Sequence, residues 1–348
     1  MDEAQRLLDW FDAHRRDLPW RENQDPYRVW VSEIMLQQTQ VATVIPYYQR
    51  FLATFPSVEA LAAAEIDEVL ALWSGLGYYR RARQLHAAAC RIAELGAFPE
   101  TVAGLRELPG IGAYTAAAVA SIAFDVVEPV MDGNVERVLA RKLALEGDPK
   151  KAAPRRALLA AAADLLDPQR PGDSNQALME LGAMVCTPVN PKCLLCSFRE
   201  SCTARLEGRP EDYPPVRKRR ATEKIRWGTV VFRRRDAVLL FRRSDDDGLL
   251  AGTWELPWFE IEGKAFAAPA AKRILQRRYG GEWRIGDRLG TVRHGITYRS
   301  LTVEVFEGAL EGGVEVAEST VEAGWFDDSA RRRLALSALV EKALRKAA

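Results

Sequence analysis

The sequence lacks long hydrophobic runs, since none of its apolar stretches approaches the ~20 residues that a membrane-spanning helix needs. Its first segment, MDEAQRLLDWFDAHRRDLPW, is a charged amphipathic helix without the apolar core of a signal peptide. Internal repeats are absent, and the only compositional bias is an enrichment in alanine. We therefore expect an intracellular protein with no membrane association, in a reducing compartment.

Cysteine is also scarce, with only five in 348 residues. Four of them fall within seventeen residues, with the spacing C-x₆-C-x₂-C-x₅-C: Cys186, Cys193, Cys196 and Cys202. Four soft thiolates that converge on one point favour an iron–sulfur cluster. A structural zinc site and unpaired core cysteines are the alternatives. The fifth, Cys90, lies in a helical run and is expected to be a small buried apolar residue.

The chain has no large excess of positive or negative charge, since its net charge is +1. The charged residues are, however, unevenly distributed along the sequence. Residues 214–243 contain eleven Lys or Arg against two acids, and residues 307–328 contain seven acids and no base. The basic stretch is suited to a polyanion such as nucleic acid. The alternative is a solvated linker and strand face.

The pattern of apolar residues predicts two domains of different class. Residues 1–206 are rich in Ala and Leu at helical spacing and include the cysteine loop 186–202, which predicts an all-α domain. Residues 207–224 are rich in proline and charge and are typical of a linker. Residues 225–348 alternate strand patterns with one central and one final helix, which predicts an α+β domain.

A hairpin motif, LPGIG at 108–112, lies between two helical stretches. Gly110 and Gly112 allow positive φ and a close approach of the backbone. The hairpin and the following helix N-terminus would then direct N–H groups at a DNA phosphate. An ordinary turn between two helices is the alternative.

Two carboxylates are the candidates for catalysis. On a helix, Glu33 shares a face with Val29, Trp30 and Leu36, an apolar neighbourhood that would raise its pKa and keep a proton available. Asp132 precedes a helix in MDGNVERVL, where it would act as an N-cap and present one oxygen to a substrate. Cleavage of a glycosidic bond uses one acid and one carboxylate. The alternatives are a solvent-exposed glutamate and a plain helix cap.

Taken together, these residues resemble the MutY-type adenine DNA glycosylases of the helix–hairpin–helix glycosylase superfamily. The resemblance rests on LPWR (18–21), WVSEIMLQQTQV (30–41), GLGYYRRARQL (75–85), LPGIGAYTA (108–116), MDGNVERV (131–138), NQALMELGAMVC (175–186) and the four cysteines. It implies base excision repair in which adenine mispaired with 8-oxoguanine or guanine is hydrolysed from DNA, leaving an abasic site. It also implies that the cysteines hold a [4Fe–4S] cluster.

The resemblance assigns roles to residues around the reaction. Glu33 would protonate adenine and help to position water, Asp132 would stabilise the sugar cation, and Asn134 would orient Asp132 or the water. Tyr114 stands at the hairpin position where relatives that also cleave the strand have a lysine, so we expect a monofunctional glycosylase.

Further family positions concern binding. Trp20, Arg21 and Glu180 match positions near the adenine pocket. Gln38, Thr39, Leu76 and Tyr78 match residues that wedge into the duplex and touch the opposite base, which fits a mechanism in which the target base leaves the stack. A plain core role is the alternative for Trp20, Leu76 and Tyr78.

The C-terminal segment resembles the Nudix-like module of the same family, which senses 8-oxoguanine. Its helix AAKRILQRRYG has no carboxylate to bind Mg²⁺, so we expect no pyrophosphatase activity. The family's Phe-Ser-His loop is here TVRHGITYRS, with Val292, Arg293 and His294 at those positions. Arg293 would donate to a base edge or grip a phosphate, so the requirement for the lesion is open.

The partner implied is double-stranded DNA with A:8-oxoguanine mispairs, bound by a monomer in the bacterial cytoplasm and associated with the nucleoid through DNA. Two alternatives stay open. One is a related glycosylase that excises another base, such as T opposite G. The other is a non-catalytic iron–sulfur protein that binds DNA.

Overall fold

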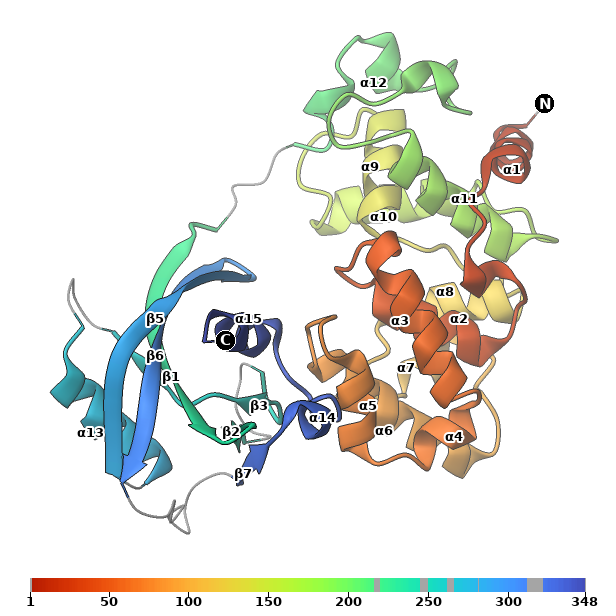
Figure 1. Cartoon of the computed structure of the whole chain (residues 1–348). Coiled ribbons are helices and arrows are strands. Elements are labelled where there is room, and N and C mark those ends of the chain that lie inside the picture. Colours follow the sequence, from red (N-terminus) through yellow and green to blue (C-terminus); the bar gives the residue numbers. More distant parts are fainter. Residues whose placement is uncertain are drawn as a thin grey trace. The chain divides into compact units, whose positions relative to one another are not determined.

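The computed structural model describes residues 2–215, 220–244, 250–261, 266–280, 282–311 and 322–347. The chain divides into two compact units, Met1–Ala62 with Ala87–Lys218, and Ala63–His86 with Arg219–Ala348. Figure 1 shows helices in the first and a sheet with helices in the second. The domain boundaries at 206 and 224 stay predictions.

The first unit contains no strand among residues 2–215, which confirms the all-α prediction. Its longer helices are α1 (Glu3–His14), α2 (Pro26–Leu36), α3 (Val41–Thr54), α8 (Ala113–Ala123), α9 (Gly133–Lys142), α10 (Ala152–Ala163) and α11 (Pro171–Met184). Shorter helices are α4 (Val58–Ala62), α7 (Val102–Arg106) and α12 (Thr203–Leu206), with 3-10 turns at Pro19–Arg21, Cys193–Leu195 and Pro210–Asp212. Helix α6 (Arg80–Leu95) begins in the second unit and ends in the first.

Two local features fix the helix that carries Glu33. Asp25 caps α2, because its Oδ1 accepts the N–H of Arg28 at 2.8 Å, and Pro26 occupies the first turn, where no N–H donor is needed. Helix α8 packs against α2 and α11. Eight of its eleven residues are buried, and half of these are alanine, so the neighbouring helices can approach closely.

A hydrophobic core joins α1, α9, α10 and α11. Leu7, Phe11, Leu139, Leu178 and Phe198 are buried in it, and Cys186, Cys196 and Cys202 pack against its edge. Each fully buried side chain of this size contributes about 1.5–3 kcal/mol to folding. The cysteine loop is therefore attached to the core that also holds α9 in place.

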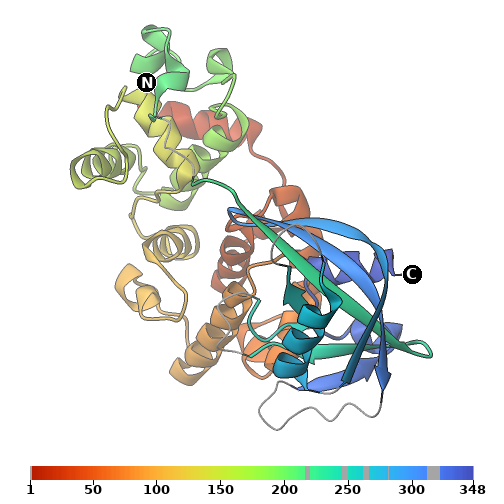
Figure 2. The same ribbon diagram turned by 90° about the vertical axis from the view of Figure 1, so that its left-hand side faces the viewer.

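The second unit is built on a mixed sheet, which confirms the α+β prediction. Its strands are β1 (Glu223–Arg234), β2 (Ala237–Arg242), β3 (Trp254–Glu255), β4 (Trp258–Glu260), β5 (Glu282–Ile296), β6 (Arg299–Glu311) and β7 (Ala323–Phe326). The main order is β3-β2-β1-β6-β5, with β4 on β1 and β7 on β2. Strands β1 and β6 are parallel, while the other pairs are antiparallel. Figure 2 shows the long curved strands in green and blue.

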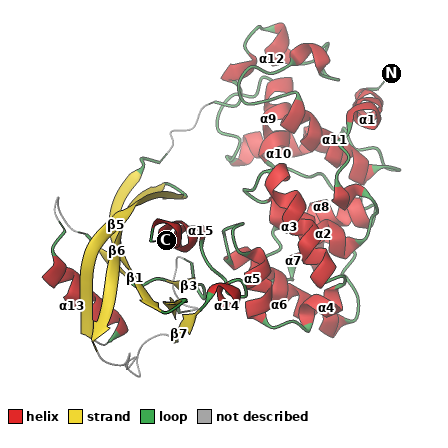
Figure 3. Cartoon of the chain, in the orientation of Figure 1, coloured by secondary structure: helices red, strands yellow, loops and turns green. Residues whose placement is uncertain are grey.

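The two faces of this sheet pack against different helices (Figure 3). On one face Val230 and Phe232 pack with α13 (Ala268–Tyr279). On the other face Val231 packs with α15 (Ala338–Lys346). Because successive side chains of a strand point to opposite faces, a continuous apolar run serves both cores. The unit also contains α5 (Ile66–Trp73) and α14 (Asp328–Arg331).

The structure corrects the sequence analysis at residues 291–300, which were read as a loop. Residues up to Ile296 continue β5, and β6 begins at Arg299, so only Thr297 and Tyr298 form the turn. Arg293 pairs with Thr302, and His294 pairs with Leu301. Pairing with β6 makes this segment a strand, although its short glycine-containing sequence does not predict one.

None of the helices in the described ranges is long and apolar enough to cross a bilayer.

Candidate active site

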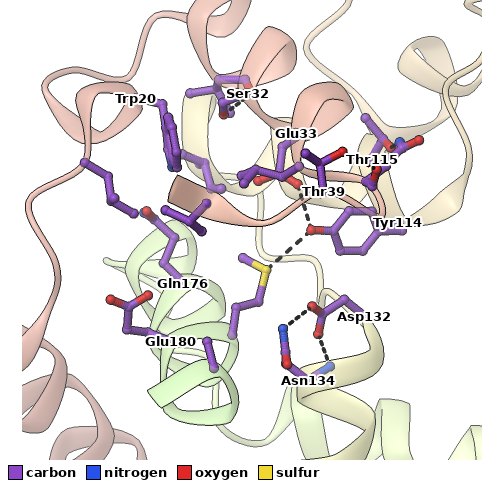
Figure 4. A pocket seen from close by; sticks show the side chains of 18 of the residues that line it. Trp20, Ser32, Glu33, Thr39, Tyr114, Thr115, Asp132, Asn134, Gln176 and Glu180 are labelled. Atoms are coloured by element: carbon purple, nitrogen blue, oxygen red, sulfur yellow. Dashed lines mark hydrogen bonds between the residues drawn. The ribbon is translucent and has the colours of Figure 1, made fainter. Parts of the chain in front are cut away.

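A cavity of about 720 Å³ lies in the first unit between α2, α8, α9 and α11 (Figure 4). The structure brings eleven of the predicted residues to it: Trp20, Arg21, Glu33, Gln38, Thr39, Gly110, Gly112, Tyr114, Asp132, Asn134 and Glu180. They come from segments far apart in the sequence. The roles of these residues stay predictions, but their convergence on one cavity is a property of the fold.

Glu33 faces the cavity from α2 and is only 6% exposed, which confirms its expected burial. Its Oε2 accepts one hydrogen bond at 2.7 Å from the hydroxyl of Tyr114 (Figure 4). Burial raises the pKa of Glu33 to about 7, because the low dielectric disfavours the charged form. The Tyr114 hydrogen bond opposes that shift, while the charge of Asp132 adds to it.

Asp132 is held as the N-cap of α9. Its Oδ1 accepts the backbone N–H groups of Asn134 at 2.8 Å and Val135 at 2.7 Å. Its Oδ2 accepts the side-chain amide of Asn134 at 3.0 Å, and Arg137 in turn donates to the Asn134 oxygen at 2.8 Å. Burial raises the pKa of Asp132, and these three N–H donors work against the shift. The expectation that Asp132 caps the helix is confirmed, and Asp132 also lines the cavity, while its contact with a substrate stays a prediction.

The two carboxyl groups therefore have different surroundings around one cavity. Glu33 receives a single hydroxyl donor, whereas Asp132 receives three N–H donors and lies at the positive end of a helix. Donors to the charged form favour the carboxylate. The arrangement suits one group that keeps a proton and one that gives it up, as glycosidic bond cleavage requires.

A third carboxylate, Glu180 on α11, is 1% exposed and lies between two arginines. Arg16 donates to it through Nε at 2.8 Å and Nη2 at 2.7 Å, and Arg21 donates through Nη2 at 3.1 Å. Burial alone would raise the pKa of Glu180, but the hydrogen bonds from Arg16 and Arg21 outweigh it and lower the pKa to about 2. Arg21 also donates to Gln176 at 3.0 Å.

Sequence reasoning missed Arg16, Gln176 and Met179, which also line the cavity. The sulfur of Met179 lies 3.5 Å from the Tyr114 hydroxyl. Proximity to the motifs was the available signal: Arg16 lies two residues before LPWR (18–21), and Gln176 and Met179 lie within NQALMELGAMVC (175–186), on the same helix as Glu180.

The hairpin residues differ in backbone conformation. Gly110 has φ 75°, which glycine adopts readily, but Gly112 is extended at φ −86° and ψ 176° and caps α8. Of the two glycines predicted to allow positive φ, Gly110 therefore adopts it and Gly112 does not. Trp20 is buried edge-on against Tyr48, with ring centroids 5.5 Å apart.

Four predicted residues belong to the second unit: Leu76, Tyr78, Arg293 and His294. Leu76 is 6% exposed and Tyr78 is 43% exposed. On β5, Arg293 is exposed and His294 is half-buried, and burial lowers the pKa of His294. These four residues do not line the cavity.

The four cysteines lie together at the edge of the α9–α11 core. Burial raises the pKa of Cys196 to about 12, and the charges of Cys186, Cys193 and Cys202 add to the shift, so the four sulfurs interact electrostatically. Arg141 Nη1 lies 3.3 Å from the Cys186 sulfur. Among the residues described, no group of three His, Cys, Asp or Glu is placed to hold a single metal ion.

Comparison with known proteins follows the two units. Residues 31–162 match the model of the HhH-GPD superfamily base excision DNA repair protein, and residues 228–346 match that of the NUDIX domain. The adenine DNA glycosylase of Rattus norvegicus is 37% identical, over 97% of this chain and 76% of its own. The chain belongs to the adenine DNA glycosylase family. The Mus musculus member is 40% identical, over 88% of this chain and 70% of its own.

A solved structure of a thermostable thymine-DNA glycosylase is similar, with a TM-score of 0.54 and 29% identity over 59% of this chain and 95% of that one. The resemblance stated from the motifs is thus confirmed. As an adenine DNA glycosylase, the protein is a base excision repair enzyme that acts on DNA.

The contact between α9 and α11 yields a test of how Asp132 is positioned. A Cβ added at Gly182 on α11 would lie 2.6 Å from Asn134 Cβ and 3.0 Å from the Asn134 carbonyl oxygen. Gly182→Ala should therefore displace Asn134, lower the free energy of unfolding by about 1–3 kcal/mol and slow adenine excision. Thermal unfolding and single-turnover excision measure the two effects.

Gly133→Ala is the matched stability control, because its added Cβ meets nothing within 4 Å. It should leave the melting temperature unchanged or slightly higher. Equal melting temperatures and excision rates for Gly182→Ala and the native enzyme would contradict the positioning role of this helix contact.

The pKa of Glu33 predicts how excision depends on pH. Because the protonated form is the donor, the single-turnover rate should fall as pH rises through about 7, by about tenfold per unit well above the pKa. Tyr114→Phe removes a hydrogen bond that lowers this pKa, so the descending limb should move to higher pH.

Tyr27→Phe is the control for loss of a tyrosine hydroxyl, because the Tyr27 hydroxyl donates to the Phe55 carbonyl at 2.8 Å and does not line the cavity. Its pH profile should match that of the native enzyme. A limb near the ordinary glutamate pKa of 4.5, or a profile unchanged in Tyr114→Phe, would refute the assignment.

Proposed function

We propose that the enzyme is a monofunctional glycosylase that hydrolyses the N-glycosidic bond of adenine mispaired with 8-oxoguanine or guanine, leaving an intact abasic strand. The observation that carries the proposal is the pair Glu33 and Asp132 on one cavity, the first buried with a pKa of about 7 and the second bound by three N–H donors. The volume of about 720 Å³ is sufficient for an extruded nucleotide.

Glu33 supplies the proton. An adenine anion is a poor leaving group, and protonation of a ring nitrogen makes the base leave as a neutral molecule. An ordinary glutamate would be almost wholly ionised near neutrality, whereas Glu33 remains protonated in about half of the molecules at pH 7. After the bond breaks, the same carboxylate can accept a proton from the attacking water.

Asp132 stabilises the sugar. As the bond to the base lengthens, positive charge develops on the deoxyribose, and a nearby carboxylate lowers the energy of that state. Asn134 and Val135 fix both oxygens of Asp132 before the reaction begins. This preorganisation avoids a rearrangement cost during the chemical step.

The adenine end of the cavity is set by Arg16, Arg21 and Glu180. The ion pairs leave Glu180 ionised and fixed, with polar edges facing the space in which a base would lie. Trp20 adds a buried aromatic wall. A rigid polar edge beside an aromatic wall discriminates between bases by hydrogen bonding.

Strand cleavage is not expected. Among the described residues, those that line the cavity include no lysine, and without a side-chain amine no Schiff base forms with the sugar. Burial raises the pKa of Tyr114 well above its usual value, so this phenol stays neutral and serves to position Glu33.

DNA would be held outside the cavity by backbone and basic groups. Gly110 and the N-terminus of α8 suit a phosphate. In the second unit, Arg293 is exposed on β5 and can donate to the O6 and N7 edge of guanine, which 8-oxoguanine alters at N7. We infer that Arg293 and His294 contact the opposite base with a weaker preference for the lesion.

We also propose that Cys186, Cys193, Cys196 and Cys202 hold a [4Fe–4S] cluster. The donor set fits: four thiols interact through their charges, Arg141 lies beside one sulfur, and the buried hydroxyl of Ser197 has no hydrogen-bond partner among the residues that the structure describes. When bound, the cluster supplies four thiolate bonds that tie residues 186–202 into one loop. Arg141 would compensate the negative charge, and its bonds to the carbonyls of Thr187 and Pro188 shape the loop.

The central test is excision from defined duplexes. Purified enzyme should produce alkali-labile sites at adenine opposite 8-oxoguanine, more slowly at A:G, and not at A:C, A:T or T:G. Omission of alkali should leave the strand intact. Glu33→Gln should lose excision by at least about a hundredfold, as expected for a general acid, and still bind the duplex.

Excision of thymine opposite guanine, or binding without any alkali-labile site, would contradict the proposed substrate. Unchanged excision by Glu33→Gln would contradict the assigned acid. A strand break without alkali would contradict the monofunctional reaction.

The cluster predicts a second outcome. Cys196→Ser should lose most of the ~4 irons per chain, with a lower melting temperature and weaker DNA binding. Cys90→Ser is the matched control, because Cys90 lies on α6 away from the loop, with its sulfur 3.6 Å from the Ala62 carbonyl. It should retain iron. Full iron content in Cys196→Ser, or equal loss in both variants, would contradict the ligand set.

A further inference from the structure

Residues 74–79, SGLGYY, form a tight loop between α5 and α6. Three residues have positive φ: Gly75 at 95°, Gly77 at 73° and Tyr78 at 52°. For tyrosine this conformation is uncommon and persists only where the surroundings enforce it. The indole N–H of Trp73, the last residue of α5, donates to the Gly77 carbonyl at 3.1 Å and stabilises the loop.

The loop presents an aromatic ring together with a cation. Tyr78 is exposed, and the guanidinium of Arg81 lies over its ring at 5.2 Å and over the ring of Trp73 at 5.5 Å. Exposed rings backed by arginine are suited to stacking on nucleic acid bases. The position of Tyr78 therefore depends on what fixes this loop.

The loop is fixed by one carbonyl group of the C-terminal part of the chain. The Ser74 hydroxyl donates to the Leu336 carbonyl at 2.6 Å, and the Tyr79 hydroxyl donates to the same oxygen at 2.7 Å. Tyr79 and Leu336 are both buried. The two hydroxyls use both lone pairs of this oxygen, and they flank Tyr78 and the two glycines in sequence.

Leu336 is in turn joined to the sheet. The Trp254 N–H donates to the Ala335 carbonyl at 2.9 Å, and Trp254 forms a parallel bridge with Leu336. Trp254 belongs to β3, which pairs with β2 through Arg242. Arg242 also pairs with Asp67 of α5 at 3.1 Å. The two ends of the loop are thus bound to Leu336, which is joined to the sheet, and the first turn of α5, the helix that precedes the loop, is paired with the sheet through Arg242.

We propose that the sheet of the second unit sets the position of Tyr78, and that Ser74 and Tyr79 are positioning residues for extrusion of the target base. The inference rests on the proposed function, because it assigns the loop to the step that precedes excision. The sheet that holds Leu336 also contains β5, which bears Arg293 and His294. The residues proposed to contact the opposite base and the loop that carries Tyr78 are therefore held by the same sheet.

The test separates extrusion from chemistry. A duplex with 2-aminopurine beside the target adenine brightens when the neighbouring base leaves the stack. Bound by Glu33→Gln, which should not excise, the duplex should show a large increase. Adding Tyr79→Phe or Ser74→Ala should reduce that increase, and in the otherwise native enzyme each should slow single-turnover excision about two- to tenfold, as loss of one hydrogen bond predicts.

Two comparisons exclude a merely structural effect. Ser74→Thr keeps the hydroxyl and should restore both signals. Tyr27→Phe deletes an equally buried hydroxyl that donates to a carbonyl at 2.8 Å, and it should change neither signal even if it lowers the melting temperature. Should Tyr79→Phe fail to fold, the Ser74→Ala and Ser74→Thr pair decides the question.

Native brightening and native excision rates in both Ser74→Ala and Tyr79→Phe would overturn the proposal. So would equal losses in Ser74→Ala and Ser74→Thr. Failure of the proposed function has a different signature: the native enzyme would leave adenine in place, whereas the brightening of 2-aminopurine and its dependence on Ser74 would still be measured.

Discussion

The chemistry depends on a carboxyl group buried with too few hydrogen-bond donors to stabilise its charge. Glu33 accepts a hydrogen bond from the Tyr114 hydroxyl and lies on a helix whose other buried residues are mostly apolar. Transfer of a charge from water into such a site is costly, so the group keeps its proton to a higher pH. The alanine-rich helix α8 makes this possible, because it packs closely against α2 and α11.

The same unit shows the opposite solution at Glu180, and donors that work in the same direction at Asp132. Glu180 is even more buried, yet two arginines make it a strong acid with a pKa of about 2. Asp132 accepts three N–H groups at a helix N-terminus. The three carboxyl groups that line the cavity thus differ in their donors: Glu33 accepts one hydroxyl, Asp132 accepts three N–H groups that work against the rise in its pKa, and Glu180 is paired with two arginines. A glycosylase needs this separation, with a proton beside the base and a negative charge beside the sugar.

Much of the site was predictable from the sequence because its motifs are local. Asp25 and Pro26 predict the start of α2, which fixes the face on which Glu33 lies, and Asp132 predicts the start of α9 in the same way. The two domain classes followed from helical and strand periodicities.

What the sequence did not predict depends on contacts between distant residues. Arg16 forms hydrogen bonds with Glu180, which is 164 residues away in the sequence, and Ser74 donates to Leu336, which is 262 residues away. The close contact of Gly182 with Asn134 is likewise invisible until two helices pack. The hairpin at 291–300 was missed because pairing with β6, not the local sequence, makes it a strand. Local signals identify the groups, and tertiary contacts decide their charge and position.

Direct titration of Glu33 tests the central claim most sharply. Infrared difference spectra between the native enzyme and Glu33→Gln would isolate the C=O stretch of this protonated carboxyl as pH is varied. The account predicts a band that is half lost near pH 7 and that persists to higher pH in Tyr114→Phe. A band that disappears near the ordinary pKa of 4.5 would show that burial does not hold the proton, and the proposed acid would be wrong.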